Sequence, residues 1–282
     1  MQLAYLAWAL SVAVVLTLAA PANAETKITV GCSTSERIPL EKIDHSIWDG
    51  LLKRYSSAEG RVDYAAWHKS AQDTADLDCY LANLSQGDPD ATSSTAGRLA
   101  YWINAYNAVT VAGILREYPT TSIRHHTAHV GTGYNIWRDL LLIVADKSYS
   151  LEAIESEMLR PLGEKRVHFA LVSASLGCPR LRNEAYVPER LDAQLADNAC
   201  DFFARSRNLR WDAEHRTFHV SAILHWFDDD FGSTPQDALA GVAVYISDPE
   251  IRKLAESRDY QVEFVDYDWS LNDKTTYRAS RK

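Results

Sequence analysis

The side chains best suited to covalent chemistry, a thiol and an imidazole, fall in one short stretch that contains His168 and Cys178. A cysteine thiolate is a nucleophile, and an imidazole beside it can accept the thiol proton. The apolar residues 167–173 are expected to form a buried strand that leads into a loop of small residues ending at Cys178. Loops that follow a strand often carry reactive groups, because the strand holds them in place. The stretch therefore predicts a nucleophile–base pair.

Strand geometry limits this pairing, since His168 lies about 16 Å before the end of the strand at about 3.3 Å per residue. The loop has to fold back for Cys178 to reach it; otherwise His219 or His225 supplies the imidazole. The alternative is a buried structural histidine and a cysteine that is packed or disulfide-bonded. The chain has four cysteines, which allow three full disulfide pairings that the sequence does not choose among: Cys32, Cys79, Cys178 and Cys200.

Two amides lie in the middle of a segment that is apolar on nearly every face. Asn104 and Asn107 are three residues apart, so they share one face of the expected helix. Burying an amide without partners costs about 2–7 kcal/mol, so both must be hydrogen-bonded. Either they tie down neighbouring loops, or they assist catalysis by orienting the imidazole, an oxyanion or a substrate.

Two further residues near Cys178 are candidates for substrate binding. Ser175 offers a hydroxyl, and Arg182 can bind an acidic group, although a surface salt bridge explains Arg182 equally well. The acidic run 228–230 lacks the glycine and glutamate of a calcium loop and is expected to be a solvated helix end. The stretch that contains His125, His126 and His129 could place two imidazoles at i, i+4 for a metal ion, but it has no clear helix and no third ligand nearby, so a solvated loop is expected. No metal ion or cofactor is predicted.

The elements that would position these residues follow from apolar spacing and from caps. Helices are expected over 45–55, around 77–84 and over 94–117, the last with Ser94 as the N-cap. A short helix is expected from the end of the first hairpin to about residue 159, and further helices over 189–205, 222–231, 238–246 and 250–256. Hairpins are expected for 140–144 with 147–151 and for 209–211 with 217–220, and a last strand for 261–266. Long helices with short hairpins and no βαβ rhythm indicate a single α+β domain, rich in helix, with short antiparallel hairpins and strands.

Composition and charge exclude several classes of protein. The 282 residues are 46% hydrophobic and 24% charged, a globular balance that excludes a disordered or fibrous chain. The formal net charge is -9, and no basic stripe relieves it. Such a chain repels phosphate backbones, so we expect no nucleic-acid partner.

The first 24 residues are typical of a secretory signal peptide. An apolar run from Leu6 to Ala20 is followed by small residues, and cleavage is expected after Ala24. No later segment is apolar for long enough to span a bilayer, which takes about 20 residues. The mature chain is therefore expected to be periplasmic or secreted, with no membrane span after signal removal.

Several short motifs follow one another along the chain: Gly60-Arg-Val-Asp-Tyr64, Tyr101-Trp-Ile-Asn-Ala-Tyr-Asn107, Tyr118-Pro119 with Ser122-Ile123, Leu151-Glu-Ala-Ile-Glu155, His168-Phe-Ala-Leu171, Gly177-Cys-Pro179 with Leu181-Arg182, and Tyr267-Asp-Trp-Ser-Leu-Asn272. In these stretches the sequence resembles the domain of unknown function 547 family (DUF 547). They span about Trp48 to Asn272, and the family domain is placed at 45–272, followed by a C-terminal tail at 273–282.

What the resemblance implies is a protein of the kind found among exported bacterial proteins, in a family without a settled activity. This sequence departs from the family pattern at Ser173, where many members have a second cysteine, and at Arg180, where many have proline. If the family used that cysteine pair for redox or metal chemistry, half of it is missing here. A single-thiol or a purely structural role is left for Cys178.

The sequence thus predicts a cleft between the Asn104 helix and the loop from Ser173 to Arg182, which contains Cys178. Our interpretation is a thiol-dependent hydrolase or acyl transferase, in which Cys178 attacks and His168 is its base. Its partner would be a small-molecule or peptide ligand whose identity the sequence does not give. The alternative is a non-catalytic binding or scaffold module of the cell envelope, in which the same residues hold the loop in place.

Overall fold

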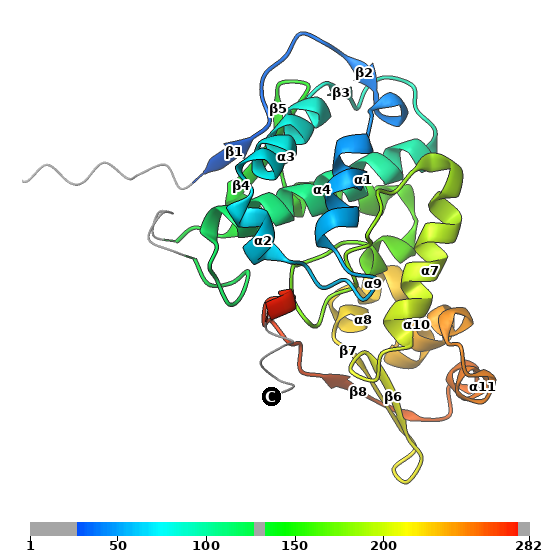
Figure 1. Ribbon diagram of the computed structural model, residues 1–282. Helices are drawn as coiled ribbons and strands as arrows, with labels where there is room; N and C mark the ends of the chain where they lie inside the picture. Colours follow the sequence, from blue (N-terminus) through cyan, green and yellow to red (C-terminus); the bar gives the residue numbers. More distant parts are fainter. Residues whose placement is uncertain (1–26, 127–132, 276–282) are drawn as a thin grey trace, which may run out of the picture.

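A 23-residue helix, α4 (Thr95–Glu117), crosses the middle of the molecule and is buried along almost its whole length (Figure 1). The computed structural model describes residues 27–126 and 133–275. The hydroxyl of Ser94 accepts a hydrogen bond from the backbone N–H of Gly97 and caps the helix. The helix ends before Tyr118-Pro119, because a residue that precedes proline avoids the helical region. The predicted helix 94–117 is confirmed.

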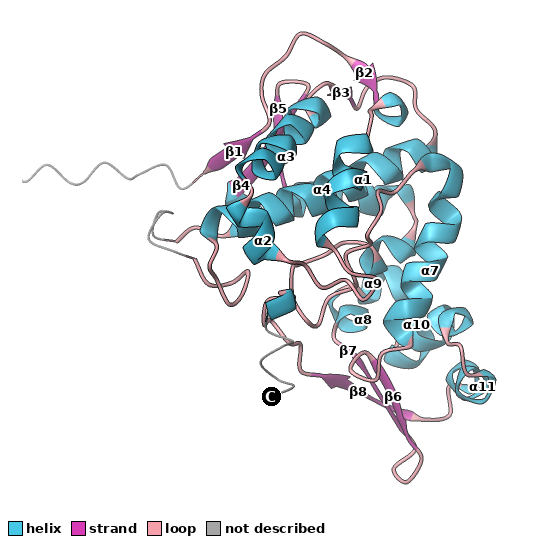
Figure 2. Cartoon of the chain, in the orientation of Figure 1, coloured by secondary structure: helices cyan, strands magenta, loops and turns pink. Residues whose placement is uncertain are grey.

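Helices from both halves of the chain surround α4 (Figures 1 and 2). The predicted helices near 45–55 and 77–84 are confirmed as α1 and α3, the latter beginning earlier than expected. The helices that precede α4 in the chain are α1 (Ser46–Tyr55), α2 (Tyr64–Lys69) and α3 (Ala71–Leu84). After α4, the predicted helix 189–205 is present as a 3-10 turn (Pro188–Arg190) followed by α7 (Leu191–Phe203). The stretch up to 159 is helical, as predicted: α6 (Leu151–Ala153) continues into a π-helix, η2 (Ile154–Leu159), and a 3-10 turn (Arg160–Leu162) follows.

In the part of the chain that the structure describes, three small sheets complete an α+β body, as predicted. The strands are β1 (Ile28–Val30), β2 (Ile38–Pro39), β3 (Gly87–Asp88), β4 (Leu140–Val144), β5 (Lys147–Ser150), β6 (Leu209–Asp212), β7 (Thr217–Ser221) and β8 (Gln261–Val265). Both predicted hairpins, β4–β5 and β6–β7, are confirmed. The sheets also contain parallel pairs that hairpin signals do not reveal: β1 with β4, β2 with β3, and β7 with β8.

The predicted helix 222–231 is broken in two. Phe227 leaves the helical region, with φ −120° and ψ 36°, and separates α8 (Ile223–Trp226) from α9 (Asp228–Phe231). Two further helices follow near the predicted places: α10 (Pro235–Val242), with a 3-10 turn at Ala243–Tyr245, and α11 (Pro249–Ser257). Because of the break, Trp226 on α8 contacts Tyr267, whereas Asp230 on α9 contacts His168.

The buried strand predicted over 167–173 is wrong. Lys165–Phe169 form a 3-10 helix, η4, and the chain then continues without regular structure. The backbone N–H groups of Ala170 and Leu171 bond to Val167 O, and that of Val172 bonds to the side chain of Asn107, so they do not pair with a strand. An apolar run shows that a segment is buried, and it does not show how its backbone bonds are made. The estimate of about 16 Å from His168 to the end of a strand therefore does not apply.

The body extends on both sides of residues 45–272. Before them, β1 and β2 pair with β4 and β3. After them, Asp273 is buried and accepts a hydrogen bond of 2.8 Å from the Tyr118 hydroxyl. The domain bounds stay a prediction, and so does the signal peptide at 1–24, which lies outside the described residues, as does His129. Within the described ranges, no helix is both long and apolar enough to cross a membrane.

Candidate functional site

A pocket of about 160 Å³ lies where α4, η2 and η4 meet the C-terminal part of the chain. It brings together residues from all parts of the fold between α4 and the segment that follows β8. Its polar side chains include Glu155, His168 and Ser173. Its walls are mostly aromatic: Tyr106, Trp137, Trp226, Phe227, Tyr267 and Trp269.

The imidazole of His168 is buried and held in one orientation. Its side chain is 1% exposed, and its ring stacks on Phe227 with a centroid separation of 3.9 Å. Nε2 lies 2.7 Å from a carboxylate oxygen of Asp230. Burial lowers the pKa of His168, although the hydrogen bond that the ring donates to Asp230 opposes this. The ring is therefore neutral at pH 7, and because a carboxylate only accepts, the proton is on Nε2.

The Asp230 carboxylate is ionised and anchored from its other side. Arg160 donates to both of its oxygens, from Nε at 2.6 Å and from Nη2 at 3.0 Å. Partial burial alone would raise the pKa of Asp230, but the hydrogen bonds from Arg160 and His168 hold it below its usual value. The expectation that 228–230 is a solvated helix end is wrong for Asp230, because α9 turns this residue toward His168.

The other nitrogen of His168, Nδ1, faces a second carboxyl group. Nδ1 is buried without a hydrogen-bond partner, and Glu155 Oε1 lies 3.7 Å from it. Burial raises the pKa of Glu155 to about 7, with Arg160 acting against it and the negative charge of Asp230 adding to it. Glu155 is on η2, and π-helical turns often occur at functional sites. A half-protonated carboxyl group thus sits beside a free imidazole lone pair.

Tyr106 adds a hydroxyl to the same pocket. It is on α4 and buried, and the indole of Trp137 donates a hydrogen bond to its oxygen. Burial, together with the nearby charge of Glu155, raises the pKa of Tyr106 well above its usual value. The hydroxyl therefore stays protonated and can donate to a bound ligand.

Cys178 is not part of this pocket. Its side chain is buried, and Sγ donates to the backbone oxygens of Ser175 at 3.0 Å and Pro179 at 3.1 Å. Burial raises the pKa of the Cys178 thiol, although hydrogen bonds with Ser175 and Ser173 oppose this. Both Cys178 and His168 lie in the described part of the chain, and no hydrogen bond joins them there.

The alternative partners of the thiol are also engaged elsewhere. His219 Nδ1 lies 3.3 Å from Glu263, and the ring of His225 stacks on Phe264. All four cysteines are free in the structure, so Cys178 is not in a disulfide. Of the interpretations of Cys178, a packed thiol fits its contacts best, and its role as a nucleophile stays a prediction.

We expect Cys178 to resist alkylation in the folded protein, because a buried thiol with a raised pKa exposes little thiolate. Iodoacetamide at about pH 7 should modify the exposed Cys32 and Cys79 and leave Cys178 until the protein is unfolded. Peptide mass spectrometry before and after denaturation measures this. Fast native labelling of Cys178 that slows in His168→Ala would instead restore the thiol–imidazole pair.

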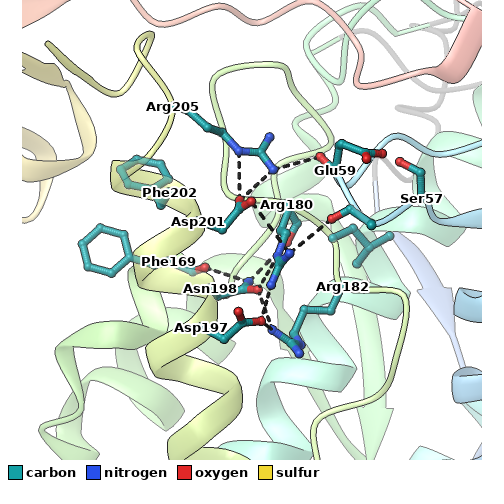
Figure 3. Close-up of polar contacts among 12 residues, drawn as sticks. Ser57, Glu59, Phe169, Arg180, Arg182, Asp197, Asn198, Asp201, Phe202 and Arg205 are labelled. Atoms are coloured by element: carbon teal, nitrogen blue, oxygen red, sulfur yellow. Dashed lines mark hydrogen bonds and ion pairs between the residues drawn. The ribbon is translucent and has the colours of Figure 1, made fainter. Parts of the chain in front are cut away.

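The two predicted substrate-binding residues make contacts within the protein. Ser175 Oγ donates to Tyr267 OH at 3.0 Å, and Ser173 Oγ lies within 3.0 Å of both. Arg182 binds Glu184 and, together with Arg180, the carboxylate of Asp197 and the amide oxygen of Asn198, as part of a network that Figure 3 shows around α7. A salt bridge, which was the alternative for Arg182, is what the structure contains.

Asn104 and Asn107 clamp two loops to α4. The Asn104 amide donates to Tyr186 O at 2.8 Å and accepts from Tyr186 N at 3.0 Å. Asn107 donates to Ala170 O at 3.0 Å and accepts from Val172 N at 2.9 Å. Tying down loops is therefore the role that their bonds show, and a direct catalytic role stays a prediction. The Asn107 clamp fixes the chain directly after η4, which carries His168.

Sequence reasoning named His168 but missed the groups around it. The sequence did offer a signal for two of these groups. Glu155 is the last residue of one stretch that carries the family resemblance, and Tyr106 lies between the two asparagines in another. Arg160 and Asp230 gave no usable signal, because their pairing joins residues 70 positions apart.

Comparisons with known proteins agree with the resemblance over part of the chain. Residues 90–203 match the model of the family described as "Protein of unknown function, DUF547". The matched segment runs from just before α4 to the end of α7 and includes Tyr106, Glu155 and His168, whereas Asp230 lies outside it. No curated protein and no solved structure matches the chain.

Proposed function

We propose that the protein is a hydrolase in which His168 is the general base and Glu155 the general acid. The observation that supports this most is the placement of the His168 ring between an ionised carboxylate on Nε2 and a carboxyl group of raised pKa near Nδ1. Two titratable groups whose surroundings push them to opposite protonation states are typical of an acid–base pair. The nucleophile is then water, and the Cys178 thiol is not required.

The contacts suggest how such a reaction would proceed on an ester or amide. His168 Nδ1 takes a proton from a water molecule while the water oxygen attacks the carbonyl carbon. The Asp230 carboxylate stabilises the imidazolium that forms. Glu155, protonated, gives its proton to the leaving group as the bond from carbon to the leaving oxygen or nitrogen breaks. The proton on Nδ1 then passes to the Glu155 carboxylate 3.7 Å away, which restores both groups.

The pocket walls support a small, partly apolar acyl group as the substrate portion that enters. A volume of about 160 Å³ admits only a few heavy atoms or a single ring, and the aromatic walls favour an apolar or flat group. The Tyr106 hydroxyl can donate to the oxyanion that develops on the carbonyl oxygen. The rest of the ligand would remain outside, where Trp226 is 45% exposed and stacks on Trp269.

A binding module without catalysis is the second candidate, and the observation that favours it is how tightly the polar groups of the Cys178 loop are bonded to one another.

We also propose that the protein is exported, with cleavage after Ala24. This proposal rests on the apolar leader alone.

We expect hydrolysis of p-nitrophenyl acetate, used as a small acyl probe, to depend on His168. His168→Gln and Asp230→Asn should each lower the rate by about 10²–10⁴, the usual contribution of a positioned acid–base group. The rate of Cys178→Ser should stay within about twofold of the wild-type rate, because the proposed nucleophile is water and not the thiol. Absorbance of released p-nitrophenolate measures all three.

A matched control separates the pocket from incidental imidazole reactivity. His219 also lies beside a carboxylate, that of Glu263, but does not line the pocket. His219→Gln should keep the wild-type rate. If His168→Gln keeps it too, the acid–base proposal fails and the binding module remains. If Cys178→Ser abolishes the rate, the thiol-dependent mechanism is the correct one.

A further inference from the structure

A second cavity, of about 590 Å³, shares no lining residue with the His168 pocket. It lies between the loop that follows α1, the loop that follows α7, and Lys274 near the end of the described chain. Its volume falls within the range of about 300–1,000 Å³ that is usual for small-molecule sites. The acid–base chemistry proposed above makes no use of it.

The charges around this cavity are mostly positive. Its charged lining consists of four basic and two acidic residues: Arg61, Arg205, Arg207, Lys274, Glu59 and Asp201. The whole chain carries a formal charge of -9, so this concentration of positive charge is opposite in sign to the rest of the molecule. A concave wall of low polarisability focuses such a field on whatever enters the cavity.

The two acidic residues do not neutralise the cavity evenly. Arg205 binds the Asp201 carboxylate with Nε at 2.9 Å and also donates to the backbone oxygen of Glu59 at 3.0 Å (Figure 3). Hydrogen bonds from its own backbone N–H and from Ser57 hold the Glu59 carboxylate and lower its pKa. Asp201 thus pairs with Arg205, and Lys274 pairs with Asp63, outside the cavity lining, at 3.4 Å. Arg207 is left facing the cavity.

Arg207 is the unusual residue of the group. In the residues that the structure describes, no hydrogen bond or ion pair reaches its guanidinium. Its pKa is lowered by partial burial and then by the positive charges of Arg205 and Arg61. An arginine that is crowded by like charges and has no carboxylate of its own is stabilised by an anion placed among them.

The loop that carries Arg61 is rigid. Ser57 N donates to Arg61 O at 2.8 Å, and Arg61 N donates to the Ser57 hydroxyl at 3.1 Å. Gly60 has φ +79°, and a Cβ there would lie 2.4 Å from Cβ of Arg180, so only glycine fits. Arg61 therefore projects from a fixed backbone, and a charged group bound to it pays little ordering cost.

We infer that this cavity binds an oxyanion, the carboxylate or phosphate group of a small molecule, through Arg207 together with Arg61 and Lys274. The planar guanidinium of Arg207 can donate two parallel hydrogen bonds to such a group, and the neighbouring cations add attraction without a fixed geometry. The cavity has room for the remainder of the molecule beside its anionic end.

Isothermal titration of the full chain with inorganic phosphate, and separately with succinate, tests the site at constant ionic strength. We expect saturable binding of at least one of the two, and the tighter one identifies the phosphate or the carboxylate as the source of the anion. Arg207→Gln should weaken that binding by about tenfold or more, which corresponds to the loss of one charge-assisted contact. Binding of neither anion overturns the inference.

The matched control is Arg210→Gln, three residues further along on the exposed face of β6 and outside the cavity lining. It should leave binding unchanged, and an equal loss in both variants would show a nonspecific effect of net charge and overturn the site. Because Arg207 gives up no partner, Arg207→Gln without anion should melt no lower than the wild type. Arg207→Lys, which keeps the charge, should bind more tightly than Arg207→Gln; equal loss in both contradicts the attraction of charge.

Discussion

Replacing Glu155 by glutamine should stabilise the protein at about pH 8 by about 3 kcal/mol, while leaving its stability at about pH 4.5 nearly unchanged. In the folded protein the pKa of Glu155 is raised from 4.5 to about 7 by burial. Each unit of that difference corresponds to about 1.36 kcal/mol between the two protonation states. Urea unfolding of variant and wild type at the two pH values gives the difference directly.

The sign follows from which state binds the proton more tightly. Below pH 4.5 Glu155 is neutral in both states, so its burial is tolerated; as the pH rises to about 7, only the unfolded chain can shed the proton at no cost. The free energy of unfolding of the wild type therefore falls as the pH rises from 4.5 to about 7. Glutamine cannot ionise, so it avoids this loss.

Subtracting the wild-type stability from that of the variant at each pH also cancels a second pH dependence, which His45 causes in both proteins. His45 is buried and its pKa is lowered to about 4, so its contribution to stability is lost as the pH falls from 6.5 toward 4 in both proteins. Glu157→Gln, an exposed change two residues later in the chain, should shift stability by about 0.5 kcal/mol or less at either pH. A Glu155→Gln effect that does not change with pH would show that the carboxylate is not desolvated.

The Asn107→Leu variant should lose about 3 kcal/mol of stability at every pH. Leucine has the same branching at Cγ as asparagine but leaves the buried Ala170 carbonyl and Val172 N–H without partners, and each unpaired group costs about 1–3 kcal/mol. Asn104→Leu should act similarly through the two backbone groups of Tyr186. Thermal melting or urea unfolding measures both.

The control for these variants is Asn83→Leu. Asn83 also donates its amide to a backbone oxygen, that of Asp44, but it does so at the surface, where water replaces the lost partner. Its effect should be about 0.5 kcal/mol or less. If Asn107→Leu is equally mild, the loop after η4 is held by its apolar packing rather than by the amide clamp.

The best-predicted part of the fold is α4, because every local signal agreed there. A serine cap, apolar residues on nearly all faces and a closing Tyr-Pro each indicate the same helix, and its start after Ser94 and its end near Glu117 were predicted from them. The β4–β5 hairpin was predicted equally well from its apolar run and its two-residue turn. Ala145 and Asp146 both have positive φ, 48° and 62°, which is the turn geometry that suits a two-residue hairpin.

The candidate site was harder to predict, because its geometry depends on contacts that local sequence does not encode. The run 167–173 was correctly expected to be buried but wrongly made a strand, since the backbone partner of Val172 is a side chain 65 residues away. His168 was singled out as an ionisable group and was paired with the nearest thiol in the sequence, that of Cys178, and its role as a base stays a prediction. Its actual partners, Asp230 and Glu155, come from a helix after β7 and from a π-helical turn.

The bond between His168 and Asp230 joins two parts of the chain 62 residues apart, and this makes the site a reporter of completed folding. A chain still being synthesised, or one clipped before α9, contains the whole segment 90–203 and yet lacks the carboxylate that fixes the imidazole. Such a chain would keep His168 as an unoriented side chain. On the proposed mechanism, incomplete molecules would therefore lack hydrolytic activity, because the carboxylate that orients the His168 imidazole is contributed by α9.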